Sequence, residues 1–308
     1  MALLEVNDLK VHYPIRGGVF GRVQNYVKAV DGVSFKIEEG ETLGLVGESG
    51  SGKSTTGKAI IGLADITAGN ILYDGKNITK YVGKNHSEYR RGVQMIFQDS
   101  YSSLNPKKRV LDIIAEPLRN FEKSTPLEEK KRIDELLDIV GLPPEAALKY
   151  PHEFSGGQRQ RIGIARAMAL KPRLIIADEP VSALDLSVQA QVLNFMKEIQ
   201  EQFNLAYLFI SHDLGVVKHM CKNIVIMNKG RFVEKGSKES IYNDPRHIYT
   251  KRLIAAIPNI DPDQREESQK FRDRVTEDYS NKYNDYYDKN NHVYDLKKIS
   301  DDHFVALP

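Results

Sequence analysis

Cysteine is nearly absent from the chain, because Cys221 is the only one among its 308 residues. A single cysteine excludes an internal disulfide framework. Long apolar runs are also missing: no window approaches the roughly 20 apolar residues that a membrane-spanning helix needs. The formal net charge is only +2, whereas a nucleic-acid-binding protein normally carries a larger and clustered basic excess. These absences argue against a disulfide-rich scaffold, a membrane-spanning protein and a nucleic-acid binder.

The remaining whole-chain features are those of an ordinary globular protein. A chain of 308 residues with 41% hydrophobic content can bury the core of one large or two modest domains. Its start, Met-Ala-Leu-Leu-Glu, lacks the basic and apolar regions of a signal peptide. We therefore expect a cytoplasmic protein, and we detect no internal repeat.

The most informative stretch is a phosphate-loop pattern, G-x-x-x-x-G-K-[ST], which directly follows the apolar run at residues 42–46. Its glycines permit the backbone conformations in which N–H groups converge on phosphate oxygens. Lys53 would reach the outer phosphates, the Ser54 hydroxyl would coordinate Mg²⁺, and a helix over residues 55–63 would direct its positive end at the anion. The alternative is an accidental match in a Gly/Ser turn, which the strand-before, helix-after context disfavours. The predicted nucleotide-binding residues of this loop are Gly47, Glu48, Ser49, Gly50, Ser51, Gly52, Lys53, Ser54 and Thr55.

Strand patterns flank the phosphate loop on both sides. Residues 3–13 predict a first strand that ends in an aromatic residue, and residues 29–37 predict a half-buried antiparallel strand. Between them, residues 14–28 contain one proline and several glycines and are interpreted as a surface loop. Two short segments, 70–73 and 77–78, flank an Asp-Gly turn. A small antiparallel β section is therefore expected around the loop.

The pattern changes further along the chain. Helix-period apolar positions over residues 110–120 and 126–140 predict a helical subdomain from about residue 98 to 170. Strands and helices then alternate, which is typical of a parallel α/β core. The expected strands cover residues 173–180, 206–211 and 224–227, and the expected helices cover residues 186–203 and 214–220.

Two adjacent carboxylates, Asp178 and Glu179, end the first of these buried strands. Mg²⁺ prefers oxygen ligands, so we expect Asp178 to lie opposite the Ser54 hydroxyl. Glu179 would project differently from the strand end and could orient and polarise an attacking water as a general base. A solvated loop is the alternative interpretation of an Asp-Glu pair, but the buried strand before it favours the catalytic one.

A second anion receptor is predicted at residues 155–158, Ser-Gly-Gly-Gln, at the start of a helix over residues 159–170. Taken alone, it could be an ordinary serine-capped helix start. The segment nevertheless shares three features with the phosphate loop: small residues, exposed N–H groups and a favourable helix dipole. One chain with two such receptors and one set of Mg²⁺ ligands suggests that the second receptor serves a nucleotide bound to another copy.

Several motifs therefore follow one another in a specific order. They are the phosphate loop at 47–55, Gln98 after Gln94-Met95-Ile96-Phe97, Ser155-Gly156-Gly157-Gln158, Asp178-Glu179-Pro180, Ser182-Ala183-Leu184-Asp185, and His212 after Leu208-Phe209-Ile210-Ser211. This order resembles the nucleotide-binding subunit of an ABC transporter over residues 3 to about 260. The resemblance implies an α/β fold: a P-loop NTPase with a RecA-like parallel-sheet core, an antiparallel β subdomain and an inserted α-helical subdomain.

The resemblance also implies roles for individual residues. Tyr13 would stack on the adenine of ATP, although on its own it would be interpreted as a strand-end aromatic. Gln98 would contact Mg²⁺ and water while sensing the membrane subunit, and Asp185 would lie in the loop that links the two sites of a dimer. His212, otherwise a core or turn histidine, would hold the γ-phosphate and Glu179. The catalytic residues implied are thus Glu179, His212 and Gln98, and the metal-binding residues are Ser54, Gln98 and Asp178.

Two further segments, 98–106 and 247–258, look like the oligopeptide/dipeptide/nickel importer branch, and specifically its F-type oligopeptide ATPase subunit. This implies ATP and Mg²⁺ as cofactors and a related but different ATPase chain as dimer partner. It also implies two transmembrane permease subunits and, indirectly, an extracellular peptide-binding protein, with this chain held at the cytoplasmic face of the membrane. Some relatives carry a cysteine cluster for an iron–sulfur centre, but Cys221 is alone, so no iron–sulfur cluster is expected.

Beyond residue 262 the composition shifts to Asp, Lys, Asn and Tyr with weak apolar periodicity. We expect an ABC ATPase domain over residues 1–261 and a polar, Tyr-rich extension over 262–308 that is poorly ordered or partner-dependent. The extension is either a solvated segment without a specific role or an interaction surface. That surface would be formed by Tyr279, Tyr283, Tyr286, Tyr287 and Tyr294.

Rival functions remain at the level of sequence. An importer of dipeptides, nickel or another small solute would use the same ATPase. A soluble ABC ATPase acting on DNA or ribosomes would be expected to carry a coiled-coil insertion or a second cassette, and neither is seen. A small-molecule P-loop kinase would have no use for the segment at 155–158.

Overall fold

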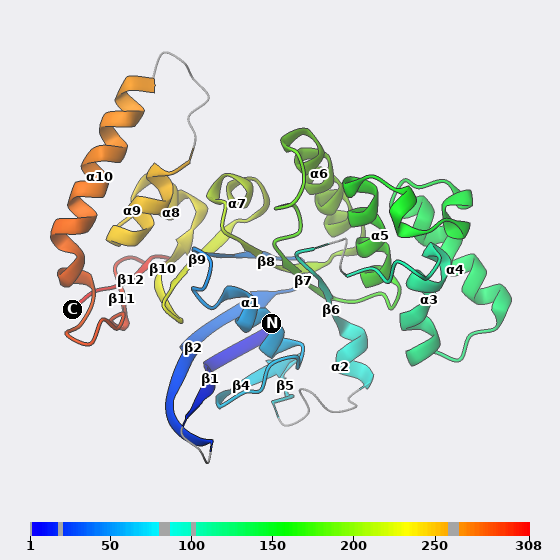
Figure 1. Ribbon diagram of the computed structural model, residues 1–308, viewed down its shortest axis with the longest axis horizontal. Helices are drawn as coiled ribbons and strands as arrows, with labels where there is room; N and C mark the ends of the chain where they lie inside the picture. Colours follow the sequence, from blue (N-terminus) through cyan, green and yellow to red (C-terminus); the bar gives the residue numbers. More distant parts are fainter. Residues whose placement is uncertain (1, 18–20, 80–86, 100–102, 258–264) are drawn as a thin grey trace.

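The computed structural model describes residues 2–17, 21–79, 87–99, 103–257 and 265–308. It confirms the expected fold class: a mostly parallel core sheet, a separate antiparallel sheet and a helical subdomain at one end (Figure 1). Residues 100–102, within one of the segments that resemble the importer branch, and the predicted domain boundary at 261/262 lie outside the described residues.

An eight-stranded sheet forms the core of the molecule. Strand β3 (Thr42–Val46) lies between β9 (Asn223–Asn228) and β8 (Ala206–Ser211) and runs parallel to both. Every residue of β3 and β8 is buried, as expected for strands that are covered on both faces. The full order is β11 (Leu296–Lys298), β12 (Phe304–Ala306), β10 (Arg231–Ser237), β9, β3, β8, β7 (Leu174–Asp178) and β6 (Val93–Ile96).

The second sheet is antiparallel and corrects one prediction. Its strand order is β2 (Arg22–Glu38), β1 (Ala2–Gly17), β4 (Ala68–Tyr73) and β5 (Lys76–Asn77). The predicted loop over 14–28 is wrong for its described residues, because β1 and β2 continue as a paired arm in which Pro14 lies opposite Tyr26. Most side chains of this arm are exposed. Backbone hydrogen bonds between the two strands hold the arm together without burial of its side chains. Its sequence therefore lacks the apolar alternation that predicts a half-buried strand.

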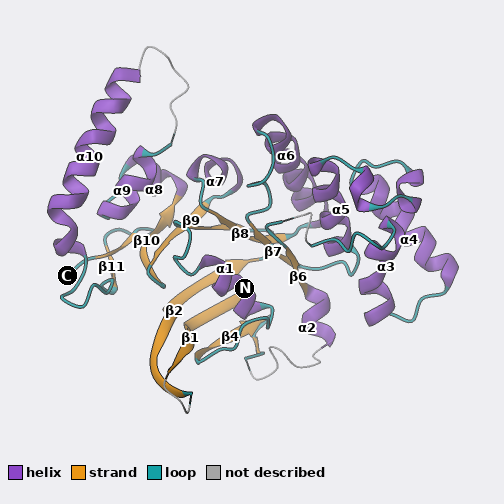
Figure 2. Cartoon of the chain, viewed as in Figure 1, coloured by secondary structure: helices purple, strands orange, loops and turns teal. Residues whose placement is uncertain are grey.

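The helical subdomain is present where it was predicted (Figure 2). Local chemistry explains its helix starts: Thr125 and Glu128 cap each other's backbone in a capping box, with Pro126 at the first helical position. Its apolar positions share one core with the parallel sheet. The elements are α3 (Val110–Phe121), α4 (Pro126–Ile139), the 3₁₀ turns Pro144–Leu148 and Pro151–Glu153, and α5 (Gly156–Met168).

The remaining helices of the core surround the parallel sheet. Helix α6 and strand β8 have the bounds predicted for them, and α7 does too. Within the described residues, none of the helices combines the length and apolar character needed to cross a bilayer. These helices are α1 (Lys53–Ile60), α2 (Ser87–Gly92), α6 (Leu186–Phe203), α7 (Leu214–Met220), α8 (Lys238–Asn243) and α9 (Ile248–Ala255).

The C-terminal extension is ordered in its described part, so the prediction of a poorly ordered tail is wrong for residues 265–308. Helix α10 (Arg265–Tyr286) lies alongside α9, and the hairpin of β11 and β12 pairs with β10 at the sheet edge (Figure 1). Tyr287 is 2% exposed, and His303 lies 2.7 Å from the buried carboxylate of Glu234. Aromatic packing and strand pairing hold this segment in place, although its sequence has little aliphatic periodicity. Four other tyrosines of the extension are partly buried and pack against the core: Tyr279, Tyr283, Tyr286 and Tyr294.

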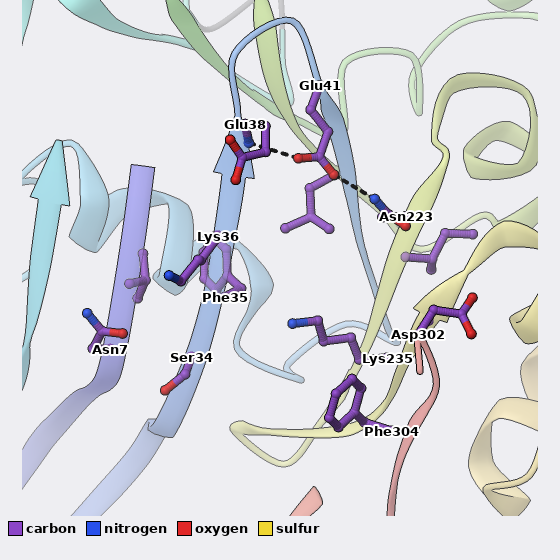
Figure 3. Close-up of a pocket in the computed structure, with 14 residues that line it drawn as sticks. Asn7, Ser34, Phe35, Lys36, Glu38, Glu41, Asn223, Lys235, Asp302 and Phe304 are labelled. Atoms are coloured by element: carbon purple, nitrogen blue, oxygen red, sulfur yellow. Dashed lines mark hydrogen bonds between the residues drawn. The ribbon is translucent and has the colours of Figure 1, made fainter. Parts of the chain in front are cut away.

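A cavity of about 410 Å³ lies where the two sheets meet the C-terminal hairpin. Figure 3 shows Glu41 accepting hydrogen bonds from the Glu38 N–H at 2.8 Å and from Asn223 at 2.7 Å. Lys235 and Phe304 form another part of its wall, with the ammonium 5.7 Å from the ring centroid. Among the described residues, its lining includes none of the phosphate loop. The cavity is therefore separate from the site described next.

Candidate nucleotide-binding site

Glycine is required at several positions of the phosphate loop. Gly50 and Gly52 have φ of 80° and 109°, a region that side-chain-bearing residues rarely adopt. A Cβ atom on Gly47 would lie 2.2 Å from the Met227 carbonyl oxygen, so the loop passes too close to β9 for any side chain there. Gly52 also caps α1, and none of the described side chains caps its first turn. These N–H groups therefore remain available for an anion.

Lys53 projects into the hollow of this loop. It is 4% exposed, and its ammonium donates to the carbonyl oxygens of Gly47 at 2.6 Å and Glu48 at 2.8 Å. Burial lowers the pKa of Lys53, while the nearby carboxylates of Glu179 and Asp178 oppose that shift. A buried ammonium whose hydrogen bonds within the described residues go to carbonyl oxygens is well suited to bind a phosphate anion.

Ser54 and Asp178 meet at the expected place. The Ser54 hydroxyl donates to Asp178 Oδ1 at 2.8 Å, although the residues are 124 positions apart. Parallel pairing explains this meeting, because β7 and β8 join to β3 and bring the end of β7 near the start of α1. Burial raises the pKa of Asp178, and the Ser54 hydrogen bond counteracts part of that rise. A cation bound by the Asp178 carboxylate would compensate its negative charge and so offset the free-energy cost of burying it.

The Glu179 carboxylate is held from two sides. Gln98 Nε2 donates to Glu179 Oε2 at 2.8 Å, and His212 Nδ1 lies 3.1 Å from the same oxygen. The backbone of Glu179 has φ of 47°, an unfavourable left-handed conformation for a non-glycine residue. Strain of this kind persists where surrounding contacts fix the chain, and its N–H donates to the Ile210 carbonyl of β8 at 2.9 Å. The three predicted catalytic residues therefore form one cluster.

The segment 155–158 forms a tight helix start. Ser155 Oγ accepts from the Gln158 N–H at 3.3 Å, and Gln158 Oε1 accepts from the Ser155 N–H at 3.0 Å. A Cβ atom on Gly157 would lie 2.5 Å from Val188, so α5 and α6 approach closely here. Asp185 is exposed at the start of α6, and its side chain caps none of the described backbone.

The structure brings some predicted residues together and leaves others apart. Lys53 and Ser54 lie with the carboxylates at the end of β7. In the described part of the chain, no hydrogen bond joins the phosphate loop to Tyr13, to Asp185 or to the segment 155–158. Tyr13 is 45% exposed on the β1–β2 arm.

Sequence reasoning missed two residues that contact the phosphate loop. Tyr249 and Arg252 of α9 both reach Glu48, and Tyr249 is 201 positions away from it. Residues 247–258 resemble the importer branch in sequence, but no spacing rule connects them to the phosphate loop. In the sequence, these two residues show only as a tyrosine and an arginine three positions apart on one helix face. Many helices carry such a pair, so the pattern does not predict a contact with the phosphate loop.

Comparisons with known proteins decide the family. The chain matches the ABC transporter family over residues 30–182 and the family described as "Oligopeptide/dipeptide transporter, C-terminal region" over residues 233–282. It is 60% identical to "Oligopeptide transport ATP-binding protein OppF" of Lactococcus lactis subsp. lactis (strain IL1403), over 99% of this chain and 96% of that protein. It is 48% identical to the OppF protein of Bacillus subtilis (strain 168), over 98% of this chain and 95% of that one. The chain belongs to the ATP-binding proteins of ABC transporters, in the oligopeptide/dipeptide branch.

Solved structures of this family agree with the fold. A dimeric bacterial ABC transporter cassette, MJ0796, matches with a TM-score of 0.65 at 26% identity, over 76% of this chain and 98% of that one. A second MJ0796 structure, described as a dimeric post-hydrolysis state bound to ADP and Pi, matches with the same TM-score at 27% identity. As an ABC ATPase, this chain binds ATP and hydrolyses it to ADP and phosphate to power transport.

Proposed function

We propose that this ABC ATPase powers an importer of oligopeptides. In this proposal it works at the cytoplasmic face of the membrane as a dimer with a second, homologous ATPase chain. Both ATPases dock on two transmembrane permease subunits, to which an extracellular peptide-binding protein delivers the solute. The observation that carries the ATPase part is the convergence of Gln98 and His212 on one carboxylate oxygen of Glu179. The oligopeptide assignment is supported by the OppF relatives.

Glu179 would act as the general base on the water that attacks the γ-phosphate. Gln98 and His212 hold its carboxylate in one orientation, which limits the reorganisation that proton transfer would require. The Lys53 ammonium would bind the outer phosphate oxygens, and the free N–H groups at the start of α1 would bind the others. Most of the catalytic effect would therefore come from positioning and charge.

The same site is suited to Mg²⁺. Ser54 and Asp178 would hold the ion, with Gln98 nearby through its contact with Glu179. These oxygen donors are of the kind that Mg²⁺ prefers, and the buried Asp178 carboxylate accepts a hydrogen bond from the neutral Ser54 hydroxyl. When bound, the ion would neutralise charge on the β- and γ-phosphates.

We place the other half of each ATP site on the partner chain. The segment 155–158 has the composition of an anion receptor but lies apart from the phosphate loop of its own chain. In a head-to-tail dimer it would bind the γ-phosphate held by the partner, and Asp185 would lie between the two sites. ATP would thus close the dimer, and hydrolysis would allow it to open and transmit the change to the permeases.

Reconstitution of transport tests the proposed function. The chain would be co-expressed with the permease, binding-protein and second ATPase genes adjacent to its own and incorporated into liposomes. We expect ATP-dependent uptake of a labelled oligopeptide that depends on all components. Dipeptide, nickel and another small solute are the alternative cargoes, and uptake of one of these in place of the oligopeptide would overturn the oligopeptide assignment while leaving the ATPase intact.

Tyr13→Ala is expected to weaken ATP binding with little effect on folding. Stacking of a base on an aromatic ring contributes roughly 1–3 kcal/mol, so affinity should fall by about fivefold or more. The side chain is 45% exposed, and the unfolding temperature should therefore change little. Equilibrium binding of a fluorescent ATP analogue measures the effect, with Tyr26→Ala on the same arm as the control. Unchanged affinity in the Tyr13 variant would rule out adenine stacking on this residue.

A further inference from the structure

Helix α9 contacts the phosphate loop from outside. The Tyr249 hydroxyl accepts a hydrogen bond from the Glu48 N–H at 2.8 Å, and the Arg252 guanidinium is ion-paired with the Glu48 carboxylate. Tyr249 is fully buried, and burial raises its pKa to about 12, so its hydroxyl stays neutral at physiological pH. Both contacts hold one loop residue, Glu48, whose neighbour Gly47 accepts from Lys53.

Helix α10 of the extension holds α9 in turn. The guanidinium carbon of Arg252 lies 4.4 Å from the ring centroid of Tyr279, within cation–π distance. Arg272 Nε donates to the Ala255 carbonyl at the end of α9 at 3.0 Å. The extension therefore fixes the side chain that pairs with Glu48, and α10 lies alongside α9 as Figure 1 shows.

A second chain of contacts reaches the loop from the same extension. The Lys229 ammonium contacts the Tyr283 hydroxyl and lies 4.7 Å from the ring centroid of Tyr287. The next residue, Gly230, donates its N–H to the Ser51 carbonyl of the phosphate loop at 2.9 Å. Two separate turns of the loop, at Glu48 and Ser51, are thus supported by groups that the tyrosines of the extension hold.

We propose that Tyr249 and Arg252 are positioning residues for the phosphate loop, and that the tyrosine-rich face of the C-terminal extension keeps them in place. The Tyr249 hydroxyl fixes the direction of the Glu48 peptide, so that the following N–H groups point into the anion site. Arg252 compensates the Glu48 carboxylate, which would otherwise place a negative charge beside a triphosphate. The extension therefore sets nucleotide affinity from a distance. This inference requires ATP binding alone and does not depend on the transported solute.

Tyr249→Phe removes the hydroxyl that accepts from the Glu48 N–H, together with its contact with the Asn228 side chain. Loss of one buried hydrogen bond to the loop should reduce ATP and ADP affinity by about fivefold. Hydrogen exchange at the amides of residues 48–50 should accelerate, with kcat at saturating ATP nearly unchanged. The matched control is Tyr207→Phe, which removes an equally buried hydroxyl that donates to the Met196 carbonyl on α6 instead. Wild-type affinity and wild-type exchange in the Tyr249 variant would overturn this role.

Arg252→Met removes the charge that pairs with Glu48, together with the guanidinium contact with the Tyr279 ring. We expect ATP affinity to fall by about fivefold at low ionic strength, and by less as salt screens the uncompensated carboxylate. A second substitution, Glu48→Gln, should restore affinity to near the wild-type value, which a simple loss of packing would not allow. Arg246→Met is the control, because its ion pair with Asp244 lies on the surface. An affinity that Glu48→Gln leaves low would contradict the charge argument.

These outcomes are separable from the proposed function. If the wild-type chain fails to bind a fluorescent ATP analogue at all, the assignment of the nucleotide site itself is wrong. If the wild-type chain binds the analogue while both α9 variants bind it equally well, only the positioning role of α9 and the extension is overturned. Unfolding temperatures of all variants show whether any loss of affinity follows from loss of the fold.

Discussion

Glu179→Gln should bind ATP with wild-type affinity and lose ATPase turnover by about 100-fold or more. The amide is close in size to the carboxylate and can still accept the hydrogen bond from Gln98, but it cannot take a proton from water. General-base catalysis contributes typically 10²–10⁴-fold, which sets the expected loss. Because nucleotide would persist, the variant should also accumulate as an ATP-bound dimer.

The backbone at this position makes glutamine the informative replacement. Glu179 has φ of 47°, and glutamine has the same backbone preferences, so the strain is unchanged between the two proteins. Phosphate release measured under single-turnover conditions gives the chemical step directly, and size-exclusion chromatography with ATP gives the dimer. Glu201→Gln, an exposed position on α6, is the control. Hydrolysis at the wild-type rate in the Glu179 variant would exclude it as the base.

Lys53→Met should reduce ATP affinity by about 100-fold while the fold stays intact. A hydrogen bond to a charged group contributes roughly 1.5–3 kcal/mol, and the upper value corresponds to this loss. Lys53 is 4% exposed, so in the absence of nucleotide the substitution removes the desolvation cost of the ammonium together with its attraction to Glu179 and Asp178, and the two effects oppose each other. Methionine has nearly the same length and retains the packing.

Binding and stability should therefore separate in this variant. Isothermal titration with ATP would report the affinity, and thermal unfolding without nucleotide would report the fold. Lys130→Met, an exposed position on helix α4, is the control and should change affinity by less than about twofold, the effect of a screened surface charge. A Lys53 variant that binds ATP as tightly as the control would show that the ammonium is not a phosphate ligand.

Local patterns predicted the regular parts of the fold well. The bounds of α6, β8 and α7 agree with the sequence interpretation, because each has a clear apolar period between turn residues. The arm at residues 14–28 and the extension after residue 264 were misjudged. Both segments are built from polar and aromatic residues whose contacts are with other segments of the chain. Neither hydrophobic periodicity nor composition predicts such contacts.

The candidate site shows the same division. Lys53, Ser54 and their loop were predicted from adjacent residues with a stated chemistry, and the meeting of Ser54 with Asp178 is confirmed. The family resemblance predicted His212 at Glu179, but for Gln98 it predicted contacts with Mg²⁺ and water. The hydrogen bond from Gln98 to Glu179, 81 positions away, was not predicted. The Tyr249 contact with the loop was not anticipated, because tertiary structure alone brings these segments together.

The hairpin of β11 and β12 has a further consequence for the behaviour of the molecule in a crowded cell. It covers β10, which would otherwise end the core sheet with unpaired N–H and C=O groups. Exposed edges of this kind add strands from other chains and promote aggregation. The covering hairpin is short and bears Lys297 and Lys298 on its outer strand, two charges that discourage such addition. The extension thus acts as a safeguard of solubility for the same sheet that carries the phosphate loop.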